Sequence, residues 1–108
     1  MKNHLPDCPV ETTLSLIGDK WKVLIVWELL SGTKRFGIIK KALPGISQKV
    51  LTHHLRDLEA NGLVNRKVYA EVPPKVEYSL TELGLSLKPI LNVMMQWGQE
   101  YKAKISMD

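Results

Sequence analysis

Five polar residues between positions 48 and 56 carry side chains that could bind a nucleic acid: Gln48, Lys49, Thr52, His53 and Arg56. At about 100° per residue they fall on one arc of a helix. These side chains can donate or accept hydrogen bonds and carry a net positive charge, so they could bind base edges in a DNA groove. The same arc could equally be an ordinary solvated face, and the surrounding elements must decide between the two interpretations.

Cys8 is the second candidate functional residue, because its thiol could be reactive. It is the single cysteine of the chain, so no disulfide can form within one subunit. Pro9 follows it, as is typical of the first turn of a helix. The positive end of a helix dipole would favour the Cys8 thiolate, whereas the neighbouring charge of Asp7 opposes it. A lone cysteine is usually an unreactive thiol, so both interpretations stay open.

Other reactive groups are too scattered to form a catalytic or metal centre. His4 and Cys8 are four residues apart but too few for a zinc site, and His53 and His54 point to different sides of their helix. We therefore expect no enzymatic activity, no metal and no cofactor.

The size and composition predict a single domain over residues 1–108. Hydrophobic residues make up 44% and charged residues 24%, and the net charge is +4. This balance permits a nucleic-acid or anionic partner without proving one. The first residues lack the apolar core of a signal peptide, and no apolar run approaches membrane-spanning length. We expect a cytoplasmic protein without a membrane partner.

The polar arc belongs to a predicted helix over residues 46–62. Ser47 stands where an N-cap belongs and is also a candidate DNA contact through a phosphate. Gly62 stands where a helix can end in the left-handed conformation. Leu51, Leu55 and Leu58 share one inward stripe, and His54 beside them is expected to be structural.

A shorter helix, about 36–43, precedes it across Pro44 and Gly45. Together they predict a helix-turn-helix over about 36–62. Lys34 and Arg35, in a brief extended segment before Phe36, are candidate phosphate contacts. Arg35 could equally pair with a carboxylate inside the fold.

Residues 63–80 change to the two-residue period of strands, with Pro73 and Pro74 at the tip of a hairpin. A hairpin directly after a helix-turn-helix is a wing. Arg66, Lys67 and Lys75 could lie along a phosphate backbone, although a wing can also serve only to cover the core.

The sequence predicts two helices in the N-terminal region. The first is amphipathic and ends near Gly18, and the second, over about 20–30, has apolar residues around almost its whole circumference. The second is therefore expected at the centre of the core, with Trp21 and Trp27 as packing residues.

The last predicted helix, about 81–104, begins at the N-cap residue Thr81 and should kink or restart at Pro89. Its apolar residues recur with the 3.5-residue period of a helix packed lengthwise on another helix. We expect a homodimer rather than a monomer that folds this helix back on itself. The predicted interface residues are Val10, Leu14, Leu87, Ile90, Leu91, Met94, Trp97 and Tyr101.

The chain resembles the HxlR-type winged helix-turn-helix regulators of bacteria. The motifs that carry the resemblance are Cys-Pro-Val-Glu at 8–11, Ile-Gly-Asp-Lys-Trp-Lys at 17–22, Gly-Thr-Lys-Arg-Phe at 32–36, Ile-Ser-Gln-Lys-Val-Leu at 46–51, Leu-Arg-Asp-Leu-Glu at 55–59 and Val-Pro-Pro-Lys-Val-Glu-Tyr-Ser-Leu-Thr-Glu-Leu-Gly at 72–84. It implies an α+β, mainly helical fold with a hairpin wing and terminal dimerisation helices. It also implies a homodimer on a pseudo-palindromic DNA operator, and in some members an N-terminal cysteine that responds to oxidants or electrophiles.

Two features depart from that family pattern. Gly37-Ile38-Ile39 stands where many members carry an acidic residue, and no second cysteine lies near the C-terminus. Cys8 could therefore react only with Cys8 of another subunit, with a small thiol or with an electrophile. We predict a DNA-binding transcriptional regulator, the alternative being a winged-helix module that binds protein instead of DNA.

Overall fold

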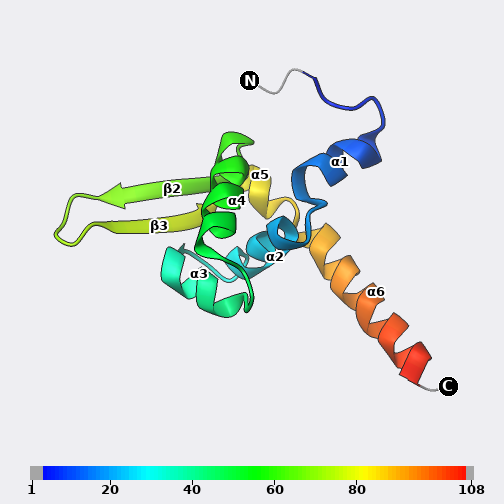
Figure 1. Ribbon diagram of the computed structural model, residues 1–108. Coiled ribbons are helices and arrows are strands. Elements are labelled where there is room, and N and C mark those ends of the chain that lie inside the picture. The colour runs from blue at the N-terminus through cyan, green and yellow to red at the C-terminus, as the bar shows by residue number, and fades with distance from the viewer. Residues whose placement is uncertain (1–3, 107–108) are drawn as a thin grey trace.

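The computed structural model describes residues 4–106 and is mainly helical, with a small antiparallel sheet (Figure 1). The described elements are α1 (Pro9–Ile17), α2 (Lys20–Leu29), β1 (Lys34–Arg35), α3 (Phe36–Ala42), α4 (Gln48–Ala60), β2 (Val64–Tyr69), β3 (Lys75–Leu80), α5 (Glu82–Leu85) and α6 (Lys88–Ser106). The predicted α+β winged helix-turn-helix is confirmed.

The core forms where α2 packs against α3 and α4. Ile25, Val26 and Leu29 of α2 are fully or almost fully buried. They belong to one cluster with Ile39, Leu51, Leu55, Leu58, Leu63, Val64 and Leu80. The expectation of a helix buried on nearly all sides was too strong, because Trp27 is 36% exposed on the side of α2 that faces α6.

The predicted ends of α4 are confirmed by their hydrogen bonds. The Oγ atom of Ser47 accepts a hydrogen bond from the Val50 backbone N–H at 3.1 Å, which satisfies a donor that the helix itself leaves free. Gly62 has a φ of +79°, a conformation that glycine adopts without steric cost, and the Leu63 N–H donates to the Leu58 carbonyl. These contacts fix both ends of α4.

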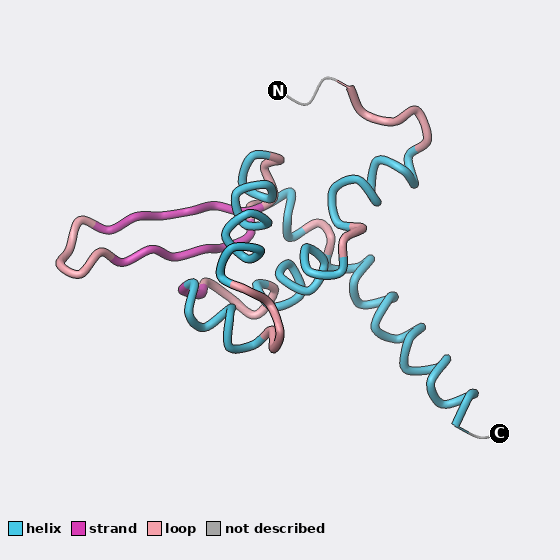
Figure 2. The backbone as a smooth tube through the Cα atoms, viewed as in Figure 1, coloured by secondary structure: helices cyan, strands magenta, loops and turns pink. Residues whose placement is uncertain are grey.

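The sheet has the strand order β1-β3-β2, with all pairs antiparallel. The β2–β3 hairpin projects from the helical body, so neither of its faces is covered near the tip (Figure 2). Val64, Tyr78 and Leu80 at its base are buried, whereas Val68 farther out is 53% exposed. The predicted alternation of buried and exposed residues therefore holds only at the base.

The helix predicted over 81–104 with a kink or restart at Pro89 forms as two helices, α5 and α6. Thr81 caps α5 by accepting a hydrogen bond from the Gly84 N–H at 3.0 Å. Gly84 packs so closely on the Leu63 carbonyl that a Cβ atom would lie 2.2 Å from its oxygen. The helix restarts at Lys88 with Pro89 in the first turn of α6, which confirms the predicted interruption.

Two of the predicted dimer residues already pack within one subunit. Leu91 is only 3% exposed and belongs to the core, and Leu87 is half-buried against it. We correct the predicted interface by removing both, since the bend after α5 turns this part of the chain onto the body. The remaining residues of the stripe on α6 are exposed.

Candidate nucleic-acid interface

The outer face of α4 brings together the five polar residues singled out by the sequence. Gln48, Lys49, Thr52, His53 and Arg56 line one shallow hollow of about 540 Å³. Thr52 is half-buried and the other four are exposed. The helix therefore presents donors, acceptors and positive charge on a single accessible surface.

The inner face of α4 is held on α2 by a polar cluster as well as by leucines. His54 is buried, and its Nε2 atom lies 3.4 Å from Oδ1 of Asp19. Lys22 forms an ion pair with Asp57 in the same region. Burial lowers the pKa of His54, and the Asp19 carboxylate partly offsets that effect. The structural role expected of His54 agrees with this position.

The cations of this region fall into two groups. Among the described residues, Lys49, Arg56 and Arg66 have no carboxylate oxygen within 4.0 Å. Lys34 instead pairs with Glu28, its Nζ atom 2.5 Å from Oε2. We correct the prediction for Lys34, because a half-buried ion pair already satisfies its charge.

Lys75 is also committed to contacts within the wing. Its Nζ atom lies 3.6 Å from Oε2 of Glu77 and 4.6 Å from the centre of the Tyr69 ring. We correct the prediction for Lys75, because its contacts with Glu77 and Tyr69 already largely balance its charge.

Arg35 lies opposite Glu77 in the β1–β3 register. The pKa of Glu77 is lowered, first by the hydrogen bond that the Tyr69 hydroxyl donates at 2.7 Å, then by Lys75 and Arg35. Arg35 thus lies across the strands from a carboxylate, but among the described residues it does not form the ion pair inside the fold that was one of its two interpretations. It remains exposed and makes no ion pair within 4.0 Å among the described residues.

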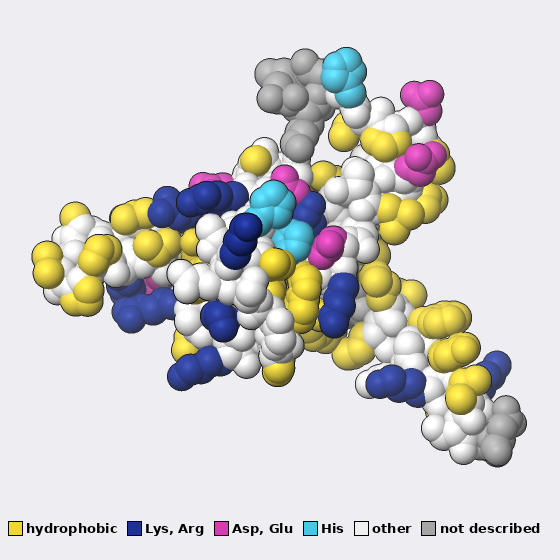
Figure 3. Space-filling model, viewed as in Figure 1, with side chains coloured by type: hydrophobic (Ala, Val, Ile, Leu, Met, Phe, Trp, Pro, Cys, Tyr) yellow, Lys and Arg dark blue, Asp and Glu magenta, His cyan; other side chains and the backbone are white. Residues whose placement is uncertain are grey.

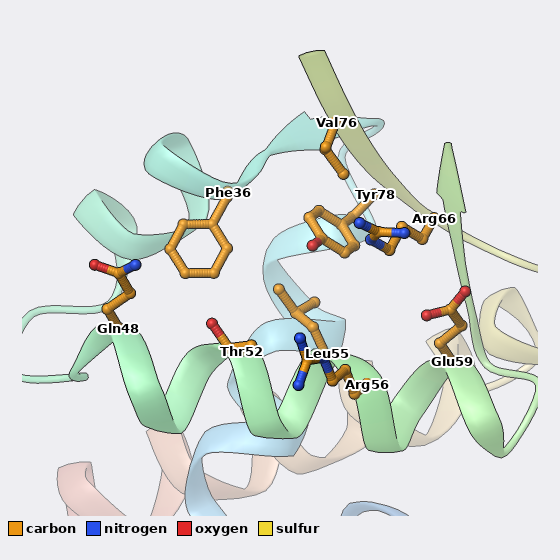
Figure 4. Close-up of a pocket in the computed structure, with 9 residues that line it drawn as sticks. All are labelled: Phe36, Gln48, Thr52, Leu55, Arg56, Glu59, Arg66, Val76 and Tyr78. Atoms are coloured by element: carbon orange, nitrogen blue, oxygen red, sulfur yellow. The ribbon is translucent and has the colours of Figure 1, made fainter. Parts of the chain in front are cut away.

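A second hollow lies between α4, the start of α3 and the wing, and the sequence did not predict it. Figure 4 shows Phe36 and Tyr78 facing α4, with Arg66 and Glu59 at one end. Its volume is about 420 Å³. Glu59 follows Arg56 by three residues and therefore lies on the same side of α4. This spacing could have indicated from the sequence that Glu59 lies beside the polar face.

Lysine and arginine side chains border the wing and lie over the neighbouring helices on the face drawn in Figure 3. Lys40 and Lys41, in the last turn of α3, are exposed and add to this charge. Neither lysine was among the predicted DNA contacts.

A model of the HxlR-like helix-turn-helix family matches residues 16–106. The chain belongs to the HxlR family. It is therefore a helix-turn-helix transcriptional regulator with a DNA-binding fold, and the resemblance noted in the sequence is confirmed.

Relatives and solved structures agree with this assignment. The chain is 52% identical over 98 residues to the uncharacterised HTH-type transcriptional regulator YdeP of Bacillus subtilis, covering 91% of this chain and 77% of YdeP. The redox regulator HypR in its oxidised form superposes with a TM-score of 0.82 at 52% identity, covering 86% of this chain and 96% of HypR. The reduced form of the transcriptional regulator YodB from B. subtilis superposes with a TM-score of 0.76 at 41% identity, covering 89% of this chain and 95% of YodB.

Cys8 lies at the N-cap of α1 in this HxlR-family chain, exposed and free. Its backbone carbonyl accepts from the Thr12 N–H at 3.0 Å, whereas its side chain makes no cap hydrogen bond. Figure 1 shows α1 on the side of the body away from the wing. A change at Cys8 would therefore have to act on DNA binding through the arrangement of helices.

Within residues 4–106, no three histidine, cysteine or acidic side chains are grouped closely enough to hold a metal ion. In the same range, no helix has the length and apolar character needed to cross a membrane.

Proposed function

We propose that this regulator binds a pseudo-palindromic operator in duplex DNA as a homodimer, with one α4 in the major groove of each half-site. The observation that carries the proposal is the outer face of α4 beside a projecting wing, where Lys49 and Arg56 are exposed and form no ion pair with any described residue. A helix of this kind after a tight turn is the usual reading element of a helix-turn-helix.

The side chains on α4 have distinct roles in this proposal. Gln48 pairs bidentately with adenine, Thr52 meets a thymine methyl group, and Lys49 and Arg56 donate to guanine or phosphate. His53 contacts the DNA backbone.

Phosphate contacts flank this reading helix on both sides. Ser47 can add a phosphate contact to its cap role, because its residue is exposed. Arg66 on β2 and Arg35 on β1 hold the flanking phosphates, since both guanidinium groups are exposed.

The homodimer is proposed from the exposed apolar stripes of α1 and α6. Figure 1 shows both helices extending from the body on the side away from the wing. Large apolar residues with 44% to 66% exposure line them: Val10, Leu14, Ile90, Met94, Trp97 and Tyr101. Exposed apolar stripes of this kind favour a protein partner over water. A second copy supplies the same surface and sets the distance between the two α4 helices.

Cys8 is proposed as the switch of this dimer. The likeness to HypR, which is named a redox regulator, supports a thiol-based response. Its thiolate would add to a ring carbon of an electrophile such as a quinone. The carbon–sulfur bond forms as the C=C π bond of the quinone breaks, and the electron pair moves to a carbonyl oxygen, which takes a proton from solvent. The bulky adduct at the N-cap of α1 would then shift the dimer helices and change the spacing of the two α4 helices.

Footprinting on the promoter region next to the protein's own gene tests the proposal, with and without a quinone. We expect a two-part footprint and an affinity that falls steeply with salt, because phosphate neutralisation releases counterions. A protein that binds duplex DNA without sequence preference, or only at very low salt, would contradict specific operator binding and favour a protein-binding module. For the switch, Cys8→Ser should keep the footprint in the presence of quinone. Equal loss of DNA from Cys8→Ser and the parent protein would exclude Cys8.

A further inference from the structure

Two polar contacts on the inner face of α4 join this helix to the start of α2. The Nε2 atom of His54 lies 3.4 Å from Oδ1 of Asp19, and Lys22 forms an ion pair with Asp57. The side chains of His54 and Lys22 are 11% and 13% exposed, so each contact has one largely buried member. A buried polar group that loses its partner costs free energy, which favours the one arrangement of the helices that keeps both contacts.

The spacing of these residues constrains both the position and the rotation of α4. His54 and Asp57 are three residues apart, which places them on one face of α4 and about 4.5 Å apart along its axis. Asp19 and Lys22 are also three residues apart, at the N-cap and in the first turn of α2. Two directional contacts at separate points oppose rotation of α4 about its axis. The leucines of the inner face supply less of this constraint, because apolar burial has no preferred direction.

The proposed reading face lies directly beside the two anchored positions. His53 and Arg56 precede His54 and Asp57 in the chain, and the rings of the two histidines lie 5.5 Å apart, centre to centre. On a helix about 10–12 Å across, a rotation of about 20° moves a surface side chain by about 2 Å. Hydrogen bonds to base edges do not tolerate such a movement, whereas a long side chain can still reach a phosphate. Rotation of α4 would therefore remove base contacts before phosphate contacts.

We propose that the four residues of these two contacts are positioning residues for DNA reading, because they set the rotation of α4 and thereby its discrimination between sequences. The proposal rests on the proposed function, in which the outer face of α4 reads the operator. It gives a role to two sequence motifs. Ile-Gly-Asp-Lys-Trp-Lys at 17–22 supplies Asp19 and Lys22, and Leu-Arg-Asp-Leu-Glu at 55–59 supplies Asp57.

An apolar replacement of the ion pair tests this role. The double variant Lys22→Met/Asp57→Leu keeps side chains of similar size between the helices but removes the directional contact, and such replacements often leave stability unchanged. Fluorescence anisotropy measures its affinity for an operator obtained by footprinting and for a scrambled duplex of equal length and composition. We expect operator binding to weaken at least about tenfold and binding of the scrambled duplex to stay within about twofold of the parent's.

A second ion pair of the same kind provides the matched control. Lys34 and Glu28 are 19% and 25% exposed, and they join β1 to α2 without involving α4. Lys34→Met/Glu28→Leu should leave the ratio of operator to scrambled affinity within about twofold of the parent's.

Two further variants separate positioning from stability. The reversed pair Lys22→Glu/Asp57→Lys restores the contact with charges that suit both helix ends, and operator affinity should return to within about threefold of the parent's. Asp19→Ser keeps an N-cap for α2 but removes the carboxylate beside His54. It should weaken operator binding more than scrambled binding, and it gives the same test if Lys22→Met/Asp57→Leu fails to fold.

Three results would overturn the proposal. Lys22→Met/Asp57→Leu that keeps the operator preference would exclude the ion pair from DNA reading. Equal weakening of operator and scrambled binding, with a lower urea midpoint, would show that the pair only stabilises the fold. An equal loss of preference in Lys34→Met/Glu28→Leu would show that the effect does not pass through α4.

Failure of the proposed function would give a different result. A parent protein without preference for any operator would refute operator reading itself. The rotation of α4 is then measured in the free protein by NMR, as side-chain contacts between α2 and α4. These contacts should change in Lys22→Met/Asp57→Leu and stay the same in Lys34→Met/Glu28→Leu. Identical contacts in both variants and the parent would overturn the positioning role.

Discussion

The Nε2 atom of His54 on α4 lies 3.4 Å from Oδ1 of Asp19, the residue that caps α2. The same Asp19 oxygen accepts a hydrogen bond from the Trp21 N–H at 2.8 Å. One carboxylate therefore both starts the central core helix and contacts the proposed reading helix. The ion pair between Lys22 and Asp57 joins the same two helices.

His54 should make stability depend on pH. Burial lowers its pKa below the ordinary value of 6.5, and among the described residues its buried Nδ1 atom has no hydrogen-bond partner. Asp19 and Asp57 raise this pKa, whereas Lys22 and His53 lower it further. The unfolded chain therefore binds a proton at higher pH than the folded chain. The free energy of unfolding should fall as pH drops below about 6.5 and level off below the folded pKa.

Urea denaturation followed by circular dichroism at about pH 7.5 and about pH 5.5, at one protein concentration, measures this effect. Asp19 contributes little in this range, because its pKa is lowered from 3.8, chiefly by the Trp21 N–H, and its stabilisation is lost only at lower pH. His54→Gln should remove most of the difference between the two pH values. His53→Gln, at the exposed neighbouring position, is the matched control, and an equal reduction in both variants would contradict this role of His54.

Arg56 and Lys34 should differ sharply in their effect on DNA binding. Arg56→Ala removes an exposed cation from the proposed reading face, and operator binding should weaken by roughly 1–3 kcal/mol if Arg56 contacts a base. Lys34→Ala should leave the salt dependence of binding unchanged, because Lys34 is paired with Glu28. Fluorescence anisotropy over a salt series measures both variants. Equal losses in the two would show that ion pairing within the protein does not separate these cations.

Trp97 should be required for the proposed dimer. It is 64% exposed on the apolar stripe of α6 and stacks on Tyr101, with ring centres 5.4 Å apart. Trp97→Glu places a charge on that surface, and sedimentation velocity at micromolar concentration should show a monomer. Gln99→Glu adds the same charge on the opposite side of α6 and should leave the dimer intact. A dimeric Trp97→Glu protein would move the interface away from this stripe.

Ser47 should contribute to stability through its cap alone. Ser47→Ala removes the acceptor of the Val50 N–H, and the free energy of unfolding should fall by about 1 kcal/mol. Ser47→Asn retains a capping acceptor and should recover most of this loss in chemical denaturation. A full loss in both variants would indicate that the hydroxyl acts in another way.

The sequence by itself determined the features that depend on neighbours along the chain. Ser47, Gly62 and Thr81 act on backbone groups at the helix ends where they stand, so their roles could be predicted without coordinates. The helical period likewise separated the leucines of α4 from its polar residues. A cap or a periodic face is defined by residues a few positions apart, and this is why the helix-turn-helix and the wing were predicted.

Only the tertiary structure decided which of the predicted residues are free to act. Glu28 forms an ion pair with Lys34 across a turn, and Glu77 forms one with Lys75 of its own wing. Leu91 is buried in the core after the chain restarts as a helix at Lys88. The cleft beside Arg56 exists because β2 and β3 return to lie beside α4. Pairing, burial and cavities depend on groups that meet through space, and sequence spacing does not specify those meetings. The polar arc of α4 could therefore be predicted, but its accessible charge and its adjoining cleft could not.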